Sequence, residues 1–285
     1  MTVKRVGVVG SGIMGSGIVE VAAKAGYEVV LRSRAQETAD GTVAKLEKSL
    51  TRQVEKEKID EAEKTAVLDR VIAVSDLNEL SDCDLVIESV IEDLATKRQL
   101  FDDLDRVCSD SAILATNTST LPVVEMAMQT GNPERVCGIH FFNPAPMMPL
   151  VEIVAAITTS TETVDDARAF VEACGKSPVA VKDQAGFIVN ALLFPYLNNA
   201  VRMLDSGLAT RDDIDTAMKG GCNFPMGPLE LLDLVGLDTS LSIIEKLYDE
   251  FKDHNYAPAP LLKRMVTAER LGRKSGEGFY PYNKK

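Results

Sequence analysis

The chain has 285 residues, 45% of them hydrophobic and 26% charged, which is typical of a globular protein long enough for two domains. Its formal net charge of -12 opposes nonspecific binding to nucleic acid or to an anionic membrane surface, and no apolar run approaches the roughly 18 residues that a membrane span requires. The five cysteines are widely spaced and include no C-x-x-C pair, so we expect free thiols in a reducing compartment, a cytoplasmic location and no metal site.

A glycine-rich turn follows the first predicted strand. The strand begins at about Val3, which predicts that no cleaved presequence precedes it. The stretch Gly10-Ser11-Gly12-Ile13-Met14-Gly15 then fits G-x-G-x-x-G, in which the first glycine makes the turn, the second lets the backbone approach a pyrophosphate and the third allows close helix packing. A helix over 18–25 and a strand over 27–31 complete the pattern. We expect a dinucleotide to bind here; the alternative is an ordinary glycine-rich turn.

The end of the second predicted strand bears on the choice of cofactor. An acidic residue at this point would accept hydrogen bonds from the ribose 2'-hydroxyl of NAD, but the sequence reads Arg32-Ser33-Arg34. A serine does not repel a 2'-phosphate, and arginine offers it a fork of donors. We therefore favour NADP slightly over NAD. The alternative is that both arginines are solvated and that Glu37 or the backbone suffices to bind NAD.

A charged segment at about 35–70 is longer than a simple crossover requires. It contains no turn-forming pair, and we expect two helices with a break near Ile59-Asp60. Its basic residues Lys45, Lys48, Arg52 and Lys56 recur at helical spacing along one face. Such a face is usually only solvated, but on an acidic protein it also provides local positive charge for an anionic ligand.

Short apolar strands and helices continue the α/β pattern. We expect strands at 71–74, 84–90 and 112–115, with a helix over 93–107 between the second and the third. The last of these strands ends in the polar run Thr116-Asn117-Thr118-Ser119-Thr120. Such a run lies where open α/β sheets bind ligands, although it could equally cap the helix that starts near Pro122.

One of the chain's two histidines, His140, lies in an apolar strand predicted over 136–142. A lone histidine of this kind is more often a packed core residue than a catalyst. However, Glu152 lies at the centre of another apolar strand, where a carboxylate is costly to bury without a partner. If the two strands adjoin, Glu152 can hold one imidazole nitrogen and leave the other for a substrate. We therefore expect His140 to act as a general base oriented by Glu152.

The composition changes after a helix over 163–174 and a last strand over 177–181. A hinge is expected at 183–186, and helices at 187–204, 211–218, 228–235, 237–251 and 258–268. We expect an α/β fold in which a Rossmann-type, mostly parallel sheet with an inserted helix pair is followed by an all-α domain. The boundaries are 1–184 for dinucleotide binding and 185–285 for substrate binding and dimerisation. The first helix of the second part is apolar nearly all round, so a partner subunit is a natural cover.

The block His140-Phe141-Phe142-Asn143-Pro144, taken with Glu152, resembles the short-chain L-3-hydroxyacyl-CoA dehydrogenase family, particularly its bacterial 3-hydroxybutyryl-CoA dehydrogenases. The resemblance covers essentially the whole chain. The other blocks that carry it are Gly10 to Gly15, Ile87-Glu88 through Glu92, Asn117-Thr118-Ser119, Gly186-Phe187-Ile188-Val189-Asn190, Pro225-Met226-Gly227-Pro228 and Gly276-Glu277-Gly278-Phe279-Tyr280.

The resemblance implies a role for individual residues. His140 would take the proton of the 3-hydroxyl while hydride leaves C3 for the nicotinamide, and Glu152 would orient His140. Ser119 would bond the reacting oxygen or the thioester region, and Asn190 would hold substrate at the domain interface. The implied cofactor contacts are Gly10, Gly12, Ile13, Met14, Gly15, Glu92, Lys97, Asn143 and, more loosely, Lys274; the implied CoA contacts are Ser49 and Lys56.

Two positions depart from the family pattern. Ser33 replaces the usual aspartate at the end of the second strand, which puts NAD preference in doubt, and Glu57 stands where relatives commonly have glycine. We expect an (S)-3-hydroxyacyl-CoA dehydrogenase that uses NADP or NAD and forms a homodimer through its helical domain. The alternatives are a dehydrogenase of free β-hydroxy acids, which would not need the basic helix pair, and a non-catalytic NAD(P)-binding sensor, which would need neither His140 nor Glu152.

Overall fold

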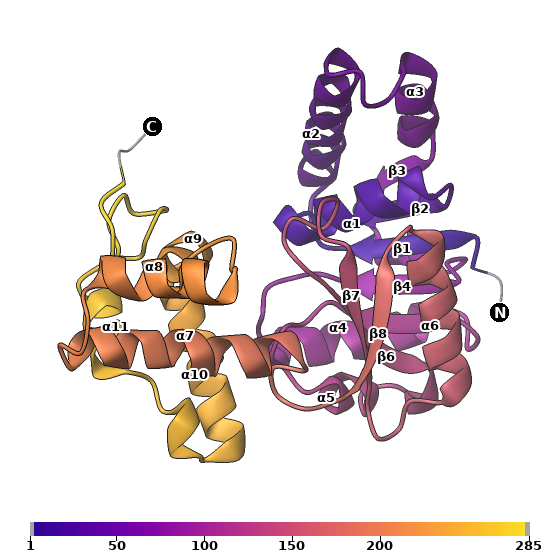
Figure 1. The fold of residues 1–285 in the computed structure, drawn as a ribbon. Helices are drawn as coiled ribbons and strands as arrows, with labels where there is room; N and C mark the ends of the chain where they lie inside the picture. The colour runs from indigo at the N-terminus through magenta and orange to yellow at the C-terminus, as the bar shows by residue number, and fades with distance from the viewer. Residues whose placement is uncertain (1–2, 283–285) are drawn as a thin grey trace. The chain divides into compact units, whose positions relative to one another are not determined.

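The computed structural model describes residues 3–282 and divides the chain into two compact units, residues 1–184 and 185–285. The first unit contains a sheet with helices, and the second is helical (Figure 1). Within residues 3–282, no helix combines the length and the apolar character needed to cross a membrane.

The first unit is built on an eight-stranded sheet of order β3-β2-β1-β4-β5-β6-β7-β8. Neighbouring strands are parallel except for β6 and β7, which run antiparallel. The predicted Rossmann-type, mostly parallel sheet is thereby confirmed. The strands are β1 (Arg5–Val9), β2 (Glu28–Arg32), β3 (Val71–Val74), β4 (Leu85–Glu88), β5 (Ile113–Thr116), β6 (Val136–Phe141), β7 (Leu150–Ala155) and β8 (Ser177–Lys182).

The central strands are buried along their whole length, which explains their continuous apolar runs. Every residue of β4, β5 and β6 is buried, as expected for strands with helices on both faces of the sheet. The helices of this unit are α1 (Ile13–Lys24), α2 (Gln36–Glu55), α3 (Glu61–Asp69), α4 (Leu94–Val107), α5 (Val123–Ala127) and α6 (Thr161–Ala173), with short 3-10 turns η1 (Leu77–Leu80) and η2 (Pro133–Arg135).

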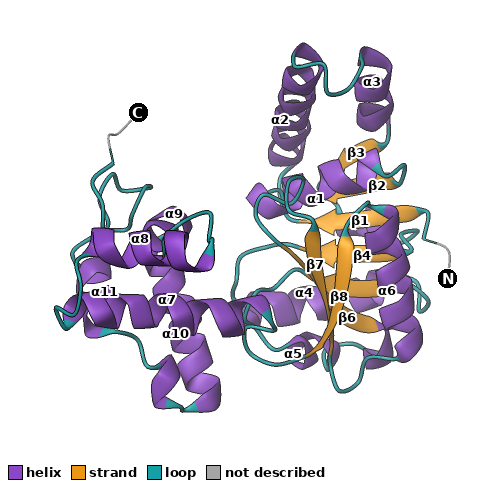
Figure 2. Cartoon of the chain, in the orientation of Figure 1, coloured by secondary structure: helices purple, strands orange, loops and turns teal. Residues whose placement is uncertain are grey.

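The predicted helix pair is present as α2 and α3, which stand together beyond the sheet (Figure 2). Helix α3 begins directly after Asp60. The Asp60 side chain accepts a hydrogen bond from the Glu63 N–H and so caps the helix. Glu57 lies in the break with a φ of +55°, a left-handed conformation that favours glycine. This geometry explains the glycine of the family pattern, and Glu57 adopts the same conformation with a side chain.

Helices and irregular loops make up the second unit; Figure 2 draws strands only in the first. Its first helix begins two residues later than the predicted start at Phe187. Gly186 and Phe187 have φ values of +75° and +50°, which right-handed helix excludes. The next helix extends past the predicted end at 218. The elements are α7 (Val189–Asp205), α8 (Arg211–Cys222), α9 (Pro228–Val235), α10 (Leu237–Phe251), η3 (His254–Tyr256) and α11 (Pro260–Thr267).

Candidate active site

The glycine turn joins β1 to the start of α1. Gly10 has a φ of +118°, and a Cβ there would lie 2.3 Å from the Ser89 carbonyl oxygen. A Cβ on Gly15 would lie 1.9 Å from the carbonyl oxygen of Gly10, so neither position has room for a side chain. In the described part of the chain, no side chain caps α1 at Gly12, and Ile13 is 77% exposed. The free N–H groups of this exposed helix start fit a pyrophosphate.

The end of β2 lies against this turn. Ser33 is buried, and its hydroxyl is 2.9 Å from that of Ser11 in the glycine turn. The Arg32 Nε donates to the carbonyl of Ser75 at the end of β3, whereas Arg34 is exposed. From the sequence, both arginines were equal candidates for contact with a 2'-phosphate. In the structure, Arg32 is hydrogen-bonded to the backbone and Arg34 is exposed.

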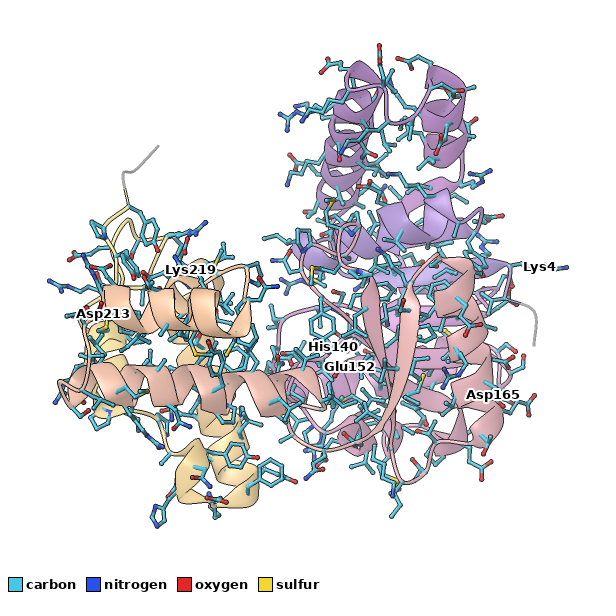
Figure 3. All side chains as sticks on the ribbon, in the orientation of Figure 1. Lys4, His140, Glu152, Asp165, Asp213 and Lys219 are labelled. Atoms are coloured by element: carbon cyan, nitrogen blue, oxygen red, sulfur yellow. The ribbon has the colours of Figure 1, made fainter. Side chains whose placement is uncertain are left out.

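His140 and Glu152 are paired across β6 and β7. They are direct partners in the antiparallel register, and His140 Nδ1 lies 2.8 Å from Glu152 Oε2 (Figure 3). The predicted adjacency of the two strands is therefore confirmed. Both side chains are buried. A carboxylate at Nδ1 favours the tautomer with its proton on that nitrogen, which makes Nε2 the nitrogen that can accept a proton.

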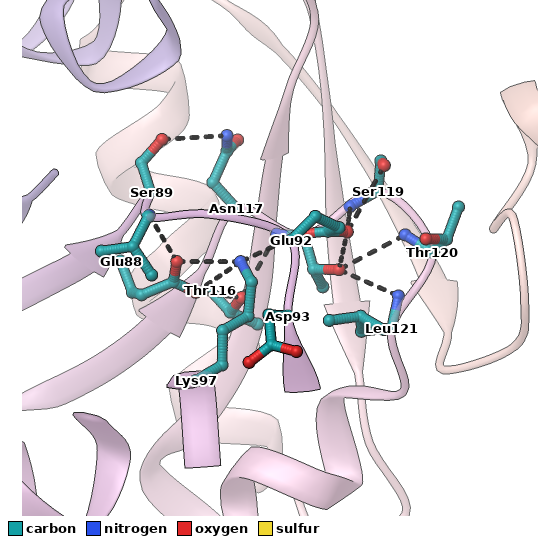
Figure 4. A network of polar contacts seen from close by, with 12 residues as sticks. Glu88, Ser89, Glu92, Asp93, Lys97, Thr116, Asn117, Ser119, Thr120 and Leu121 are labelled. Carbon is teal, nitrogen blue, oxygen red and sulfur yellow. Dashed lines mark hydrogen bonds and ion pairs between the residues drawn. The ribbon is translucent and has the colours of Figure 1, made fainter. Parts of the chain in front are cut away.

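A network of polar contacts surrounds the loop after β5 (Figure 4). The Oε1 of Glu92 accepts hydrogen bonds from the Thr118 hydroxyl at 2.5 Å and from the Ser119 N–H at 2.9 Å, while its Oε2 lies 3.0 Å from Lys97 Nζ. Burial opposes the ionisation of Glu92, but Lys97 and these hydrogen bonds outweigh it and hold the pKa of the carboxyl below its usual value. The structure thus joins Glu92, Lys97 and Ser119, three residues singled out in the sequence.

Two residues missed as site candidates complete this region. Glu88 ends β4 fully buried and contacts Lys97 through both carboxylate oxygens, at 2.8 and 2.9 Å. An acidic residue in an apolar strand was the signal that identified Glu152, and it could have identified Glu88. Asn117 accepts a hydrogen bond from the Phe141 N–H at 2.8 Å, so it ties the loop after β5 to the residue that follows His140.

The loop between β6 and β7 carries Asn143 at the surface. Lys176 fixes this loop by donating to the carbonyl oxygens of Ala145, Pro146 and Met148 at 2.8, 3.0 and 2.9 Å. Burial lowers the pKa of Lys176, since it disfavours the charged ammonium. Among residues 3–282, no cluster of three or more His, Cys, Asp or Glu side chains is arranged to hold a metal ion.

The remaining predicted site residues lie on α2 and in the second unit. The basic residues of α2 and its cap are all exposed, and Ser49 lies among them, accepting a hydrogen bond from Gln53 at 3.4 Å. In the second unit, Asn190 is buried near the start of α7, and Lys274 donates to Asp238 at 2.5 Å.

Comparisons with known proteins identify the family of both units. A family model for the 3-hydroxyacyl-CoA dehydrogenase NAD binding domain matches residues 5–184, and a model for the C-terminal domain of 3-hydroxyacyl-CoA dehydrogenase matches residues 186–282. The chain belongs to the 3-hydroxyacyl-CoA dehydrogenase family. The predicted family and the predicted enzyme class, a nicotinamide-dependent oxidoreductase, are thereby confirmed.

Several relatives match along nearly their whole length. A 3-hydroxybutyryl-CoA dehydrogenase of Mycobacterium tuberculosis is 48% identical over 282 residues, which are 98% of this chain and 99% of that protein. Human mitochondrial hydroxyacyl-coenzyme A dehydrogenase is 41% identical over 290 residues, covering 98% of this chain and 91% of that protein. The crystal structure of (S)-3-hydroxybutyryl-CoA dehydrogenase from Ralstonia eutropha superimposes with a TM-score of 0.97 at 40% identity, covering 99% of this chain and 100% of that one.

Proposed function

We propose that this chain reversibly oxidises (S)-3-hydroxyacyl-CoA, with 3-hydroxybutyryl-CoA as its representative substrate, to the 3-oxoacyl-CoA. The observation that carries the proposal is the buried pair of His140 and Glu152 at a Nδ1–Oε2 distance of 2.8 Å, near the carboxyl end of β6. Open α/β sheets bind ligands at that end of their strands. Cofactor binding alone requires no such pair.

The residues of the first unit fit a nicotinamide dinucleotide. Gly10 and Gly15 let the turn and the start of α1 pack closely, the space beside Gly12 is open to a pyrophosphate, and the exposed start of α1 supplies N–H donors. We assign two further cofactor contacts in this unit, Glu92 and Asn143. In the second unit we assign Lys274 as a cofactor contact. These residues would hold the cofactor, and a bound nicotinamide would supply the acceptor for the hydride that leaves C3 of the substrate.

His140 performs the proton step in this proposal. Its Nε2 takes the 3-hydroxyl proton as hydride leaves the same carbon, so the carbon–oxygen bond becomes a carbonyl. Glu152 holds Nδ1 and stabilises the imidazolium that forms, since the two groups are buried together. Ser119 donates a hydrogen bond to the reacting oxygen or the thioester region, and Asn190 is the substrate contact assigned in the second unit.

We further propose a modest preference for NADP. Ser33 places a hydroxyl, not a carboxylate, beside the glycine turn, and the exposed Arg34 is available to a 2'-phosphate. Arg32 contributes positive charge from its anchored position. The substitution Ser33→Asp should shift the ratio of rates with NADPH and NADH toward NADH, because a carboxylate repels the phosphate and accepts from the ribose hydroxyls.

The exposed basic face of α2 supports a CoA thioester as the substrate. Lys45, Lys48, Arg52 and Lys56 are exposed on or just beyond one helix, where they offer positive charge to the phosphates of CoA. Ser49 and Lys56 are the contacts that we assign. A free β-hydroxy acid has no phosphate for this face to bind.

The deciding experiment measures initial rates with acetoacetyl-CoA and with free acetoacetate, each with NADH and NADPH, at matched salt. Turnover of the thioester alone supports the proposal. Turnover of the free acid would support the β-hydroxy acid alternative, and absence of turnover with either would support a sensor. Faster use of NADH would contradict only the cofactor preference.

We also propose that the chain forms a homodimer and that it is located in the cytoplasm. The second unit has an apolar groove of about 440 Å³ along α7 and α8, to which Tyr196, Met203 and Met218 contribute, and Leu192 nearby on α7 is 73% exposed. A second copy of the chain would cover these side chains. Light scattering should give twice the monomer mass, and Met203→Glu should shift it toward the monomer.

A further inference from the structure

A lysine ammonium closes the loop between β6 and β7. The Nζ of Lys176 donates to the carbonyl oxygens of Ala145, Pro146 and Met148 at 2.8, 3.0 and 2.9 Å. An ammonium has three N–H donors, so these carbonyls occupy all of them. Ordering a long lysine side chain costs conformational entropy, which the three convergent contacts offset. The loop that receives them carries Asn143, to which we assign a cofactor contact.

The backbone of Lys176 is fixed at the end of α6. Gly175 has a φ of +68°, and its N–H donates to the Glu172 carbonyl at 2.9 Å. The Lys176 N–H donates to the Val171 carbonyl at 3.2 Å, and these two bonds form the Schellman motif that ends the helix. The next residue begins β8, which pairs with β7. Lys176 therefore reaches the loop from a rigid base.

The same loop packs against α1 just beyond the glycine turn. A Cβ on Gly17 would lie 3.1 Å from the Ala145 Cβ and 3.2 Å from the Pro146 Cδ, so the helix and the loop are in close contact. Where the loop leaves β6, the ring centroids of His140 and Phe142 are 4.5 Å apart. The loop thus connects the helix that we propose for the pyrophosphate with the histidine that we propose for the proton step.

Asn143 lies in the stretch between these two contacts, and its side chain is exposed. A dinucleotide with its pyrophosphate at the start of α1 and its nicotinamide near His140 has to extend past this stretch. Loops place functional side chains accurately only where the surrounding structure holds them. The three carbonyls that Lys176 holds all lie within five residues of Asn143.

We propose that Lys176 is a positioning residue for cofactor binding: by holding three carbonyl oxygens it keeps the β6–β7 loop against α1 and places Asn143 beside the dinucleotide. The inference rests on the cofactor contact proposed above for Asn143. It concerns binding and not the chemical step, so its test is separate from the test of the reaction.

The test compares cofactor affinity with turnover in Lys176→Met, which keeps most of the aliphatic side chain and removes its donors. We expect the Kd values of NADPH and NADH, from nicotinamide fluorescence, to rise about five- to thirtyfold, the scale of losing hydrogen bonds from a charged group. At saturating cofactor, kcat for acetoacetyl-CoA reduction should stay within about threefold, because strand pairing holds His140 and Glu152. Lys182→Met, exposed at the end of β8, removes the same charge and should leave both values unchanged.

The same substitution in an Asn143→Ala background shows whether the effect passes through Asn143. If it does, Lys176→Met should raise the cofactor Kd less than about twofold beyond the Asn143→Ala value, because coupled residues give non-additive losses. A full additional rise would overturn the inference. A wild-type Kd in Lys176→Met would overturn it too, even with a lowered melting temperature, since that result would leave Lys176 only a structural role.

A second substitution covers the case in which Lys176→Met does not fold. Lys176→Gln keeps two uncharged N–H donors, so the loop stays partly held and the cofactor Kd should rise about three- to tenfold with the melting temperature nearly unchanged. A wild-type Kd in Lys176→Gln would overturn the inference. A wild-type protein that binds the cofactor but turns over neither acetoacetyl-CoA nor acetoacetate would overturn the proposed function alone.

Discussion

Both units of the chain bury carboxylates, but the partners of those carboxylates differ in kind. In the first unit, Glu152 contacts the imidazole of His140 and Glu88 contacts the ammonium of Lys97. These partners are side chains that carry or exchange protons. His140 lies near the carboxyl end of β6, and Lys97 reaches from α4 to Glu88 at the carboxyl end of β4. A buried carboxylate in this unit is therefore in direct contact with an ionisable side chain.

In the second unit the buried carboxylates contact mainly backbone N–H groups. Asp215 accepts from Leu229 and Glu230 at the start of α9, and Asp233 accepts from Phe279 and Tyr280 near the end of the chain. Each therefore fixes the path of a distant segment. The comparison teaches that burial of an acid does not by itself indicate a functional site, because buried acids also fix the backbone of distant segments.

The largest effect is expected from His140→Ala. We expect kcat to fall about 10²- to 10⁴-fold, the usual scale for losing a general base, with cofactor binding nearly intact. The rates are measured at saturating acetoacetyl-CoA. His254→Ala removes the chain's other histidine, which is exposed, and is the matched control. An unchanged kcat in His140→Ala would show that His140 is not the general base. It would contradict the function proposed for the pair of His140 and Glu152.

Asp233→Ala should act on stability instead. It leaves the N–H groups of Phe279 and Tyr280 and the hydroxyl of Tyr282 without their acceptor. We expect the free energy of unfolding to fall by about 2–5 kcal/mol, since each buried unpaired donor costs about 1–3 kcal/mol and entering water can satisfy some of them. Urea unfolding measures the change. The exposed Asp249→Ala is the control, and a wild-type midpoint for Asp233→Ala would contradict the structural role.

Glu152→Gln tests the first unit with a smaller change. The amide keeps the shape of the side chain but removes the charge that supports an imidazolium, so kcat should fall about ten- to a hundredfold with KM nearly constant. Steady-state rates measure this, and thermal unfolding checks the fold. Glu162→Gln at the exposed start of α6 should behave as wild type. A lower melting temperature with an unchanged kcat would show that Glu152 has a structural role, as we infer for the buried carboxylates of the second unit.

The smallest expected effect is a pH dependence of the free energy of unfolding, to which Glu92 and Asp233 contribute with opposite signs. The pKa of Glu92 is held low, so its stabilisation is present above the unfolded value of about 4.3 and is lost as pH falls through the lower folded value. Burial raises the pKa of Asp233, so its contribution is present below about 3.9 and is lost as pH rises through the folded value. Urea unfolding of wild type, Glu92→Gln and Asp233→Asn across this range measures both. Shifts of the same sign would contradict the contrast.

The features that could be predicted from the sequence are those that depend on patterns among neighbouring residues. The glycine turn, the helix pair and the strands of His140 and Glu152 were all predicted, because periodicity and turn chemistry are properties of neighbouring residues. The burial of Lys97 was also within reach, since it falls among the apolar positions that repeat along α4 with Phe101 and Leu104. The resemblance to the family implied a cofactor contact for Lys97, and its burial was not predicted.

The remaining features depend on contacts between distant residues. Asp233 is an acid in a helix like many others, and its partners lie 46 and 47 residues further along the chain. The hydroxyl pair of Ser11 and Ser33 likewise forms only when the sheet brings β1 and β2 together. No local pattern encodes such pairings, so the sequence predicted the residues near the site better than the network that orients them.

The attachment of the last residues to Asp233 and Asp215 has a consequence for how the protein is made. Tyr280 donates its N–H to Asp233 and its hydroxyl to Asp215, which lie 47 and 65 residues earlier in the chain. Domains generally fold from the N-terminus during synthesis. The sheet-containing unit therefore has all its residues while the helical unit is still being synthesised, whereas both buried acids of the helical unit are made well before the tyrosine that contacts them.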